Sequence, residues 1–239
     1  MYNCSQKDTY RAAIRIDGAT GGHSRISNSV THNGLDWGIS IQKSNNVELI
    51  DNVFVGYRAV GMNIHKIRNC TITGNFIGDV VGRNLPFIDS TVDKEACVAY
   101  SSYFKGAPSY DIIFTDNIAA GCVYAGFVAP GHECGDSNQK SFRNNVAHSV
   151  GGEGYGAHIY QNPADKTSKC FEMSHFTAYK CQSVCFVAWG VTSEERVHDM
   201  TCVDNRLGVS MNIGGEREEA EIAMWDSEVW GEAGAEDCP

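Results

Sequence analysis

Five aromatic and imidazole side chains recur at matching places in short apolar segments of this chain: His65, Tyr100, His158, Tyr160 and Trp189. An aromatic ring stacks against the apolar face of a sugar, while histidine and tyrosine hydrogen-bond to its hydroxyl groups. The five residues are therefore candidates for contact with a glycan or a protein partner. The alternative is that they pack beneath a loop or against a neighbouring domain.

Acidic residues are available for catalysis, but their spacing assigns no active site. Hydrolysis of a glycosidic bond needs two carboxylates close together, and the candidates are Asp79, Asp89, Asp93, Glu95 and Glu153. The sequence contains no nucleophile elbow, phosphate-binding loop or calcium loop, and no cysteine–histidine cluster with zinc spacing. We therefore predict no catalytic residue, metal site or cofactor. A polysaccharide lyase or hydrolase acting on a strand face is the alternative function.

The candidate residues belong to a repeat. Seven five-residue segments line up at 38–42, 61–65, 96–100, 126–130, 156–160, 185–189 and 208–212, and successive starts are 23, 35, 30, 30, 29 and 23 residues apart. The second and fourth residues of each segment are apolar, which is the period of a strand with one buried face. This spacing predicts an all-β chain, folded as a right-handed parallel β-helix of about seven to eight coils. A β-sandwich, the competing fold, does not require like residues at like places.

A column of asparagines precedes the repeated strands. Its members are Asn28, Asn52, Asn75, Asn117 and Asn145. Asparagine tolerates the left-handed conformation of a turn, and stacked amides hydrogen-bond to one another. We therefore expect a structural asparagine ladder from coil to coil. His175 and Cys202 stand at roughly the matching places of later coils.

The 239 residues are interpreted as a single β-helix domain, 1–239, which is a fragment of a larger protein. The interval between Asn75 and the segment at 96–100 is long, which predicts that residues 79–95 form an inserted loop. Residues 215–239 are acidic and are expected to form a terminal coil or edge. The formal net charge of −10 argues against nucleic acid or an anionic membrane surface as a partner.

Ten cysteines and two glycosylation sequons point to an oxidising compartment. The sequons begin at Asn3 and Asn69. Cys97 and Cys185 fall on expected strands, while Cys70, Cys170 and Cys202 fall near the opposite wall. Disulfides between coils are feasible wherever two Cα atoms approach within about 7 Å, and spacing leaves the connectivity open. Some inward cysteines are equally consistent with free thiols.

Several strings resemble the parallel β-helix regions of the fibrocystin and fibrocystin-L family. They are GGHSRISNSV at 21–30, GISI at 38–41, SNNVELIDNVF at 44–54 and GFVAPGH at 126–132 followed by Cys134. The resemblance covers roughly residues 11–214. It implies a very large extracellular protein of cilia or cell-surface coats, with a single membrane anchor elsewhere. Related β-helices occur in hyaluronan-degrading surface proteins, but the family offers no catalytic motif to carry over.

These observations together predict a structural or adhesive segment of a large secreted or cell-surface glycoprotein. Its expected partners are other domains of the same chain, other surface proteins or glycans. We expect no membrane contact within these residues.

Overall fold

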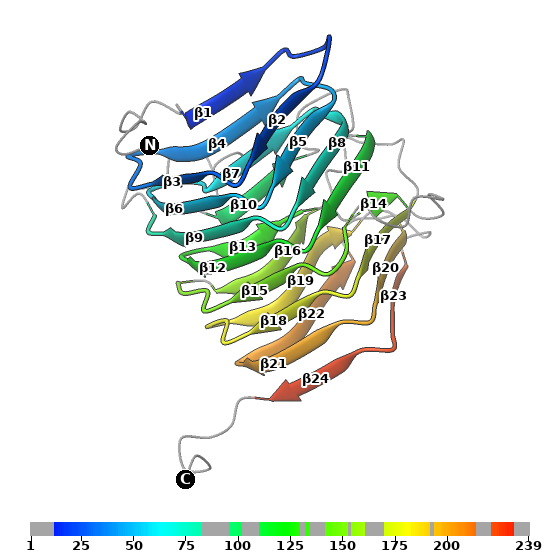
Figure 1. Ribbon diagram of the computed structural model, residues 1–239. Coiled ribbons are helices and arrows are strands. Elements are labelled where there is room, and N and C mark those ends of the chain that lie inside the picture. The colour runs from blue at the N-terminus through cyan, green and yellow to red at the C-terminus, as the bar shows by residue number, and fades with distance from the viewer. Residues whose placement is uncertain are drawn as a thin grey trace.

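The structure is a computed structural model that describes residues 12–82, 96–101, 110–129, 132–133, 142–152, 154–160, 170–191, 194–213 and 221–231. Within these residues, all the elements of regular secondary structure are β-strands. The strands wind into a parallel β-helix whose turns stack from the blue N-terminal end to the red C-terminal end (Figure 1). The predicted all-β, right-handed parallel β-helix is confirmed.

Three faces surround the interior, and we name them sheets I, II and III in chain order. Sheet I contains β1 (Ala12–Asp17), β4 (Trp37–Gln42), β7 (Met62–His65), β10 (Ala96–Ser101), β13 (Ala125–Val128), β16 (Tyr155–Tyr160), β19 (Val184–Val191) and β22 (Leu207–Ile213). Sheet II has two parts, β2 (Ser24–Ser27), β5 (Val47–Ile50), β8 (Arg68–Thr73) and β11 (Tyr110–Thr115), then β14 (His132–Glu133), β17 (Cys170–Ser174), β20 (Glu194–His198) and β23 (Ile222–Trp225). Sheet III contains β3 (Val30–His32), β6 (Val53–Tyr57), β9 (Phe76–Val80), β12 (Ile118–Cys122), β15 (Val146–His148), β18 (Thr177–Tyr179), β21 (Thr201–Asn205) and β24 (Glu228–Gly231).

The two parts of sheet II are joined through a single residue. Arg143 forms isolated parallel bridges to Thr115 on one side and to Ser174 on the other. Although sheets I and III each have eight strands, regular turns number about six, slightly fewer than the seven to eight predicted. The turn through Arg143 is less regular because a bridge replaces its middle strand.

The interior is a continuous stack of apolar side chains. Parallel pairing places Ile39 opposite Met62 and Phe186 opposite Val209, so equivalent residues of the repeat lie above one another. Ile39, Met62, Phe127 and Phe186 are fully buried. This is the outcome that the period of two in the sequence predicts.

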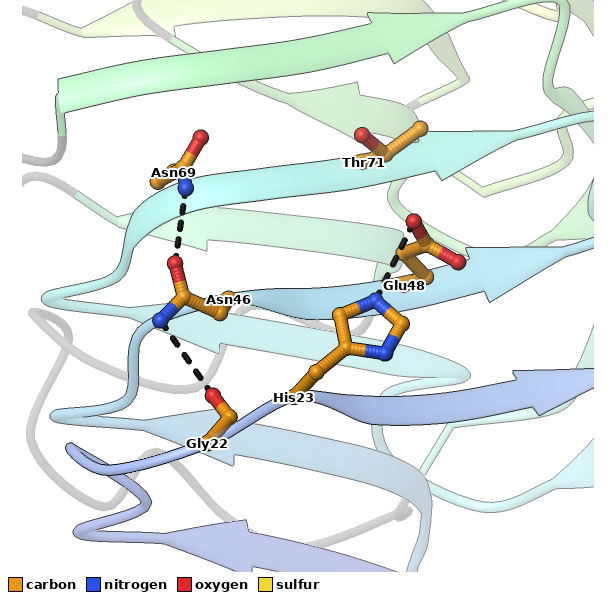
Figure 2. A pocket seen from close by; sticks show the side chains of 6 residues that line it. All are labelled: Gly22, His23, Asn46, Glu48, Asn69 and Thr71. Carbon is orange, nitrogen blue, oxygen red and sulfur yellow. Dashed lines mark hydrogen bonds and ion pairs between the residues drawn. The ribbon is translucent and has the colours of Figure 1, made fainter.

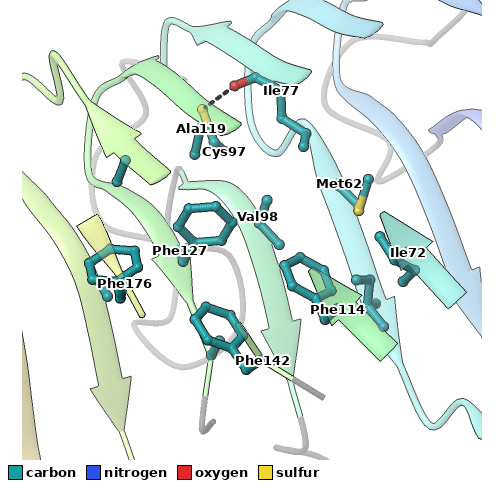
Figure 3. Packing of buried hydrophobic residues seen from close by; sticks show 14 of the residues in the cluster. Met62, Ile72, Ile77, Cys97, Val98, Phe114, Ala119, Phe127, Phe142 and Phe176 are labelled. Atoms are coloured by element: carbon teal, nitrogen blue, oxygen red, sulfur yellow. Dashed lines mark hydrogen bonds between the residues drawn. The ribbon is translucent and has the colours of Figure 1, made fainter. Parts of the chain in front are cut away.

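Four phenylalanines fill the middle of the interior (Figure 3). Phe114 stacks on Phe142 with ring centroids 5.5 Å apart, and Phe127 meets both rings edge to face. Phe127 also meets Phe176 edge to face, at 6.0 Å. The apolar core thus continues through the turn in which sheet II is interrupted, because these rings fill the interior there. Edge-to-face pairs are a favourable arrangement for aromatic rings in contact.

The predicted register of one segment is wrong by one residue. In β10 it is Val98 that pairs with Met62 and with Phe127, so the place of the leading glycine belongs to Cys97. Tyr100 consequently pairs with Ile64 and not, as predicted, with His65, and its side chain lies outside the described part of the structure. A shift of one residue exchanges the two faces of a strand.

The repeated glycines form a column where the backbone passes close to the next turn. Its members are Gly38, Gly61, Gly126, Gly156 and Gly208, with Cys97 and Cys185 completing the column. A Cβ atom added at Gly126 would lie 2.7 Å from the Cβ of Ala147 in sheet III. These positions therefore need glycine for close approach and not for an unusual φ angle.

Both cysteines of this column form disulfides to sheet III. Cys97 is bonded to Cys122 and Cys185 to Cys202, with Cα–Cα distances of 5.6 and 5.7 Å. Each bond closes a single turn of the helix. The structure therefore corrects the expectation of disulfides from coil to coil at these cysteines, because the side chain at this corner points across the interior to sheet III.

Replacing both Cys185 and Cys202 by alanine should lower the free energy of unfolding by about 3 kcal/mol, because the bond closes a loop with a sequence separation of 17. Urea unfolding measures the change. Reductant should destabilise the wild type more than this variant, which retains only one of the two bonds between described residues. Equal stability of variant and wild type under oxidising conditions would contradict the prediction.

An asparagine ladder runs through the corner between sheets II and III. The side-chain amide of Asn52 donates to Oδ1 of Asn75 (3.0 Å), that of Asn75 to Oδ1 of Asn117 (2.9 Å), and that of Asn117 to Oδ1 of Asn145 (3.1 Å). All four residues are buried. Asn28 is not a member, which corrects the prediction: it is exposed, and the backbone N–H of the next residue, Ser29, donates to Asn52.

Beside this ladder stand two columns of residues with left-handed backbone. The first contains Asn28, Asp51, Gly74, Asp116, Asn144, His175, Asp199 and Asp226, with φ between 48° and 67°. The second follows five residues later in seven turns and contains Asn33, Gly56, Asp79, Gly121, Ser149, Lys180 and Asp204. Glycine, asparagine and aspartate dominate both columns because they adopt positive φ at the lowest cost.

The structure also bears on the predicted segment boundaries. Asp79 and Val80 belong to β9, so they are not part of an inserted loop, and residues 83–95 lie outside the described residues. Within 215–239, β23 and β24 form a turn, and residues 215–220 and 232–239 lie outside the described residues. Among the residues described, none forms a helix long and apolar enough to cross a membrane.

Candidate functional site

Of the five predicted contact residues, the structure describes the side chains of His65 and His158. Tyr160 and Trp189 are neighbours in register on β16 and β19, and their side chains lie outside the described part of the structure. His65 is half-buried at the end of β7, with β10 and β13 between it and β16. Tyr100 pairs in register with Ile64, and its side chain also lies outside the described part of the structure. The register of sheet I thus places Tyr160 beside Trp189 and leaves two strands between His65 and the strand of Tyr160.

His158 belongs to a packed aromatic cluster. It is 1% exposed, and its Nδ1 lies 2.7 Å from the hydroxyl oxygen of Tyr124. The rings of Tyr124 and Tyr155 are 5.3 Å apart, and both lie within 6 Å of the imidazole. For this residue the geometry favours the packing alternative over contact with a ligand.

Exposed polar side chains lie close together instead on sheet II. A shallow hollow of about 380 Å³ lies at the starts of β2, β5 and β8, and Figure 2 shows the residues that line it. It is lined by Gly22, His23, Asn46, Glu48, Asn69 and Thr71. Asn69 donates to Oδ1 of Asn46 (2.7 Å), and Nε2 of His23 lies 3.1 Å from Glu48. The surface offers amide, hydroxyl and carboxylate groups in a row, the groups that hydrogen-bond to sugar hydroxyls.

A second polar cluster lies at the other end of the same sheet. His198 on β20 lies between two carboxylates, with Nδ1 2.7 Å from Asp199 and Nε2 3.1 Å from Glu172. Its ring stacks on Trp225 of β23 with centroids 4.8 Å apart, and His175 meets it edge to face at 6.3 Å. The cluster joins three successive turns.

Burial alone would lower the pKa of His198, but the hydrogen bonds to Asp199 and Glu172 outweigh burial and raise it. The hydrogen bond from His198 in turn lowers the pKa of Asp199. The arrangement therefore favours an imidazolium between two carboxylates. Because both acids are engaged with one histidine, they do not face each other across an open groove as a hydrolytic pair would.

The pKa shifts predict a pH-dependent contribution to stability. The raised pKa of His198 stabilises the fold fully below its unfolded value near 6.5, and this contribution is lost as the pH rises through the folded pKa. The lowered pKa of Asp199 adds stability above its unfolded value near 3.8. A His198→Gln variant should therefore lose up to about 1 kcal/mol of stability near pH 5, and less near pH 9. Urea unfolding at both pH values measures this, and a loss independent of pH would contradict it.

Sheet III presents an apolar outer surface. Its first outward column contains Val30, Val53, Phe76, Ile118 and Val146 on five successive turns. Val30 is 57% exposed and Ile118 37%. Contiguous exposed apolar surface of this kind typically marks a site of contact with another protein. We call these five residues the apolar stripe.

Sequence reasoning missed both the His198 cluster and the apolar stripe. The sequence does carry a signal for the apolar stripe, because each of its members directly follows a residue of the asparagine ladder or the residue equivalent to it in another turn. The cluster has a weaker one, because Glu172, His198 and Trp225 come from three turns and meet only through the register of the strands. Within the described residues, no group of three or more histidines, cysteines or acids could hold a metal ion.

No family model matches this chain. It is 26% identical over 198 residues to fibrocystin of Mus musculus, a match that covers 83% of this chain and 4% of the mouse protein. A solved structure, the family 28 exopolygalacturonase of Yersinia enterocolitica, aligns with a TM-score of 0.35 and 11% identity over 85% of this chain and 44% of the enzyme chain. This chain is therefore similar to a small part of a much longer protein.

Proposed function

We propose that the chain is a rigid structural and adhesive segment of a large secreted or cell-surface glycoprotein. The observation that carries the proposal is the unbroken stack of interior columns, in which each turn rests on the one before it. A solenoid of this kind extends a protein along one direction, because each turn contacts mainly its neighbours. The similarity to part of fibrocystin supports this reading.

Two disulfides within single turns support an extracellular or cell-surface location. The family resemblance extends this proposal to the ciliary surface, through a membrane anchor outside these residues. The apolar stripe of sheet III is the surface proposed for contact with other domains or surface proteins. The hollow on sheet II is the surface proposed for contact with glycans.

Asn69 is proposed to carry an N-linked glycan. It is exposed at the start of β8, where the chain turns onto sheet II, and it lines the hollow. A glycan attached there would cover the hollow, so the hollow would bind external sugars only in molecules without this modification. Asn3, the other predicted acceptor, lies outside the described residues.

The test is to express the chain in mammalian cells behind a foreign signal sequence. We expect secretion, linkage of Cys97 to Cys122 and of Cys185 to Cys202 in non-reducing peptide maps, and a mass shift on deglycosylation that Asn69→Gln reduces. The secreted protein should bind cell surfaces, and the enzymatically deglycosylated protein should bind a glycan array without degrading the bound glycan. Degradation of any polysaccharide in a panel would favour the enzyme alternative, and intracellular retention of the unoxidised chain would overturn the proposal.

A further inference from the structure

The three central members of the apolar stripe lie on inner turns of the helix. Their strands, β6, β9 and β12, are neighbours in sheet III (Figure 1), and described strands continue the sheet on both sides. In register, Phe76 lies between Val53 and Ile118. Val53 and Phe76 are half-buried, and Ile118 is 37% exposed. We call these three residues the sheet III patch.

The ring of Phe76 lies over the backbone of Gly78. A Cβ atom added at Gly78 would lie 2.8 Å from Cε1 and 3.1 Å from Cζ of this ring, so glycine leaves the room that the ring needs. Val55 and Ala120 are the neighbours of Gly78 in the second outward column. The side chains of both columns are therefore hydrocarbon in these turns. A sugar placed over them would bury hydroxyl groups without partners, whereas an apolar side chain would not.

Three exposed aspartates surround the patch. Asp51 and Asp116 precede β6 and β12 on one side, and Asp79 lies near the end of β9 on the other. In the part of the chain that the structure describes, none of the three forms an ion pair with a lysine, arginine or histidine. Arg58 belongs to the corner toward sheet I, and Arg143 belongs to sheet II. The patch thus has an apolar centre and an acidic rim.

We propose that the sheet III patch docks a protein surface with an apolar centre and a rim of lysine or arginine. The proposal rests on the adhesive function proposed above and names the chemistry of the partner. Cations of the partner would pair with the three aspartates, and one placed over the ring of Phe76 would also make a cation–π contact. Strand spacing places Asp51 and Asp116 roughly 10 Å apart along the helix axis, with Asp79 roughly 16 Å across the strands.

Charge disfavours two other occupants of the patch. A second copy of the chain, placed face to face, would bring two sets of three carboxylates together, and each copy carries a formal net charge of −10. An anionic membrane surface would meet the same repulsion. A basic protein surface matches both the apolar centre and the acidic rim.

Binding of designed hairpin peptides to the whole secreted chain tests the proposal. The basic probe carries valine and isoleucine on one face and arginine at its rim. A second probe has glutamate in place of arginine, and a third has serine in place of valine and isoleucine. We expect the basic probe to bind about tenfold more tightly than either of the others, with an affinity that falls as salt is raised. Fluorescence anisotropy measures the three affinities.

Variants of the chain locate the binding surface. Phe76→Thr should weaken the basic probe about tenfold, because it removes the ring. Asp51→Asn combined with Asp79→Asn should weaken it about tenfold as well and reduce its salt dependence. Asparagine adopts the same left-handed backbone, so these two replacements preserve the fold. Asp204→Asn is the matched control, since Asp204 lies in the same left-handed column as Asp79, beside β21, and should have no effect.

Equal binding of the basic and acidic probes, or equal effects of Asp79→Asn and Asp204→Asn, would overturn the proposal. Self-association of the wild type that Phe76→Thr abolishes would place a second copy on the patch, and a glycan-array signal lost in that variant would place a sugar there. Either result would also overturn it.

Cell-surface binding separates this proposal from the function on which it rests. If the secreted chain binds cells but the basic probe responds to none of the variants, the adhesive function stands and the patch is not its surface. If the basic probe binds as expected but the chain binds no cell surface, the patch is supported and the adhesive function fails.

Discussion

An Asn117→Ala variant should lose roughly 4 kcal/mol of stability, one of the two largest effects that we expect from a single substitution in this chain. The Asn117 amide is buried and donates to the carbonyl oxygen of Ile72 and to Oδ1 of Asn145. Its Oδ1 accepts from both the backbone N–H and the side-chain amide of Asn75. Alanine would leave several of these groups buried without a partner, and each such group costs about 1 to 3 kcal/mol.

The loss should spread along the helix, because the ladder links four successive turns. Urea unfolding measures the free energy, and Asn28→Gly is the matched control. Asn28 is an exposed asparagine of the same corner with a φ of 50°, which glycine adopts readily, so its replacement should cost little. A similar small loss for both variants would show that the ladder amides contribute no more than ordinary corner residues.

The sequence predicted the ladder but misplaced its first member for a physical reason. Asn28 belongs to the left-handed column, in which asparagine is favoured by its backbone conformation, while Asn52 to Asn145 are chosen for their side-chain hydrogen bonds. Asparagine is therefore favoured at two adjacent positions for two different reasons. Each left-handed residue of the first column is followed five residues later by one of the second column, as Asp51 is by Gly56, and this spacing distinguishes the left-handed position from the ladder position next to it.

The register of β10 could not be fixed from its own residues. Ala96, Cys97, Val98 and Ala99 are all small or apolar, so a period of two fits equally well in either phase. In the observed phase Cys97 takes the place of the repeated glycine and bonds to Cys122 across the interior. A local pattern does not show this long-range contact, so it predicts the pairing of Tyr100 one residue away from the observed one.

The candidate site shows the same limit more strongly. Sequence reasoning sought outward residues on sheet I, but Ser40, His158 and Val187 at those positions are buried. The exposed polar side chains lie on sheet II. Its strands are short, and their alternation of buried and partly exposed residues, as in Val47, Glu48 and Leu49, becomes recognisable in the sequence only when the turns are aligned with one another. The fold was therefore predictable from the repeat. The location of the exposed polar groups was not, because it depends on which of the three sheets has its outer face exposed to solvent.

A Gly156→Ala variant should lose about 3 kcal/mol or more of stability, because the added methyl group has no space to occupy. Its Cβ would meet the backbone carbonyl oxygen of Cys185 in the next turn and would lie 2.6 Å from the Cβ of Ala178. The carbonyl belongs to a strand that is hydrogen-bonded on both sides, so it can move only if the turns separate. The backbone conformation of Gly156 itself is not left-handed, and the cost is therefore steric.

Three further variants isolate this cause. Gly21→Ala should be neutral, since nothing lies within 4 Å of its added Cβ, and Gly208→Ala should cost less than Gly156→Ala, since its Cβ meets only the half-exposed side chain of Val229. Combining Gly156→Ala with Ala178→Gly removes one of the two clashes and should restore only part of the stability. Urea unfolding of the four proteins tests the order. Full recovery of stability by Ala178→Gly would mean that the carbonyl of Cys185 can move aside at little cost. The turns of this helix would then be less tightly stacked than we infer from the glycine column.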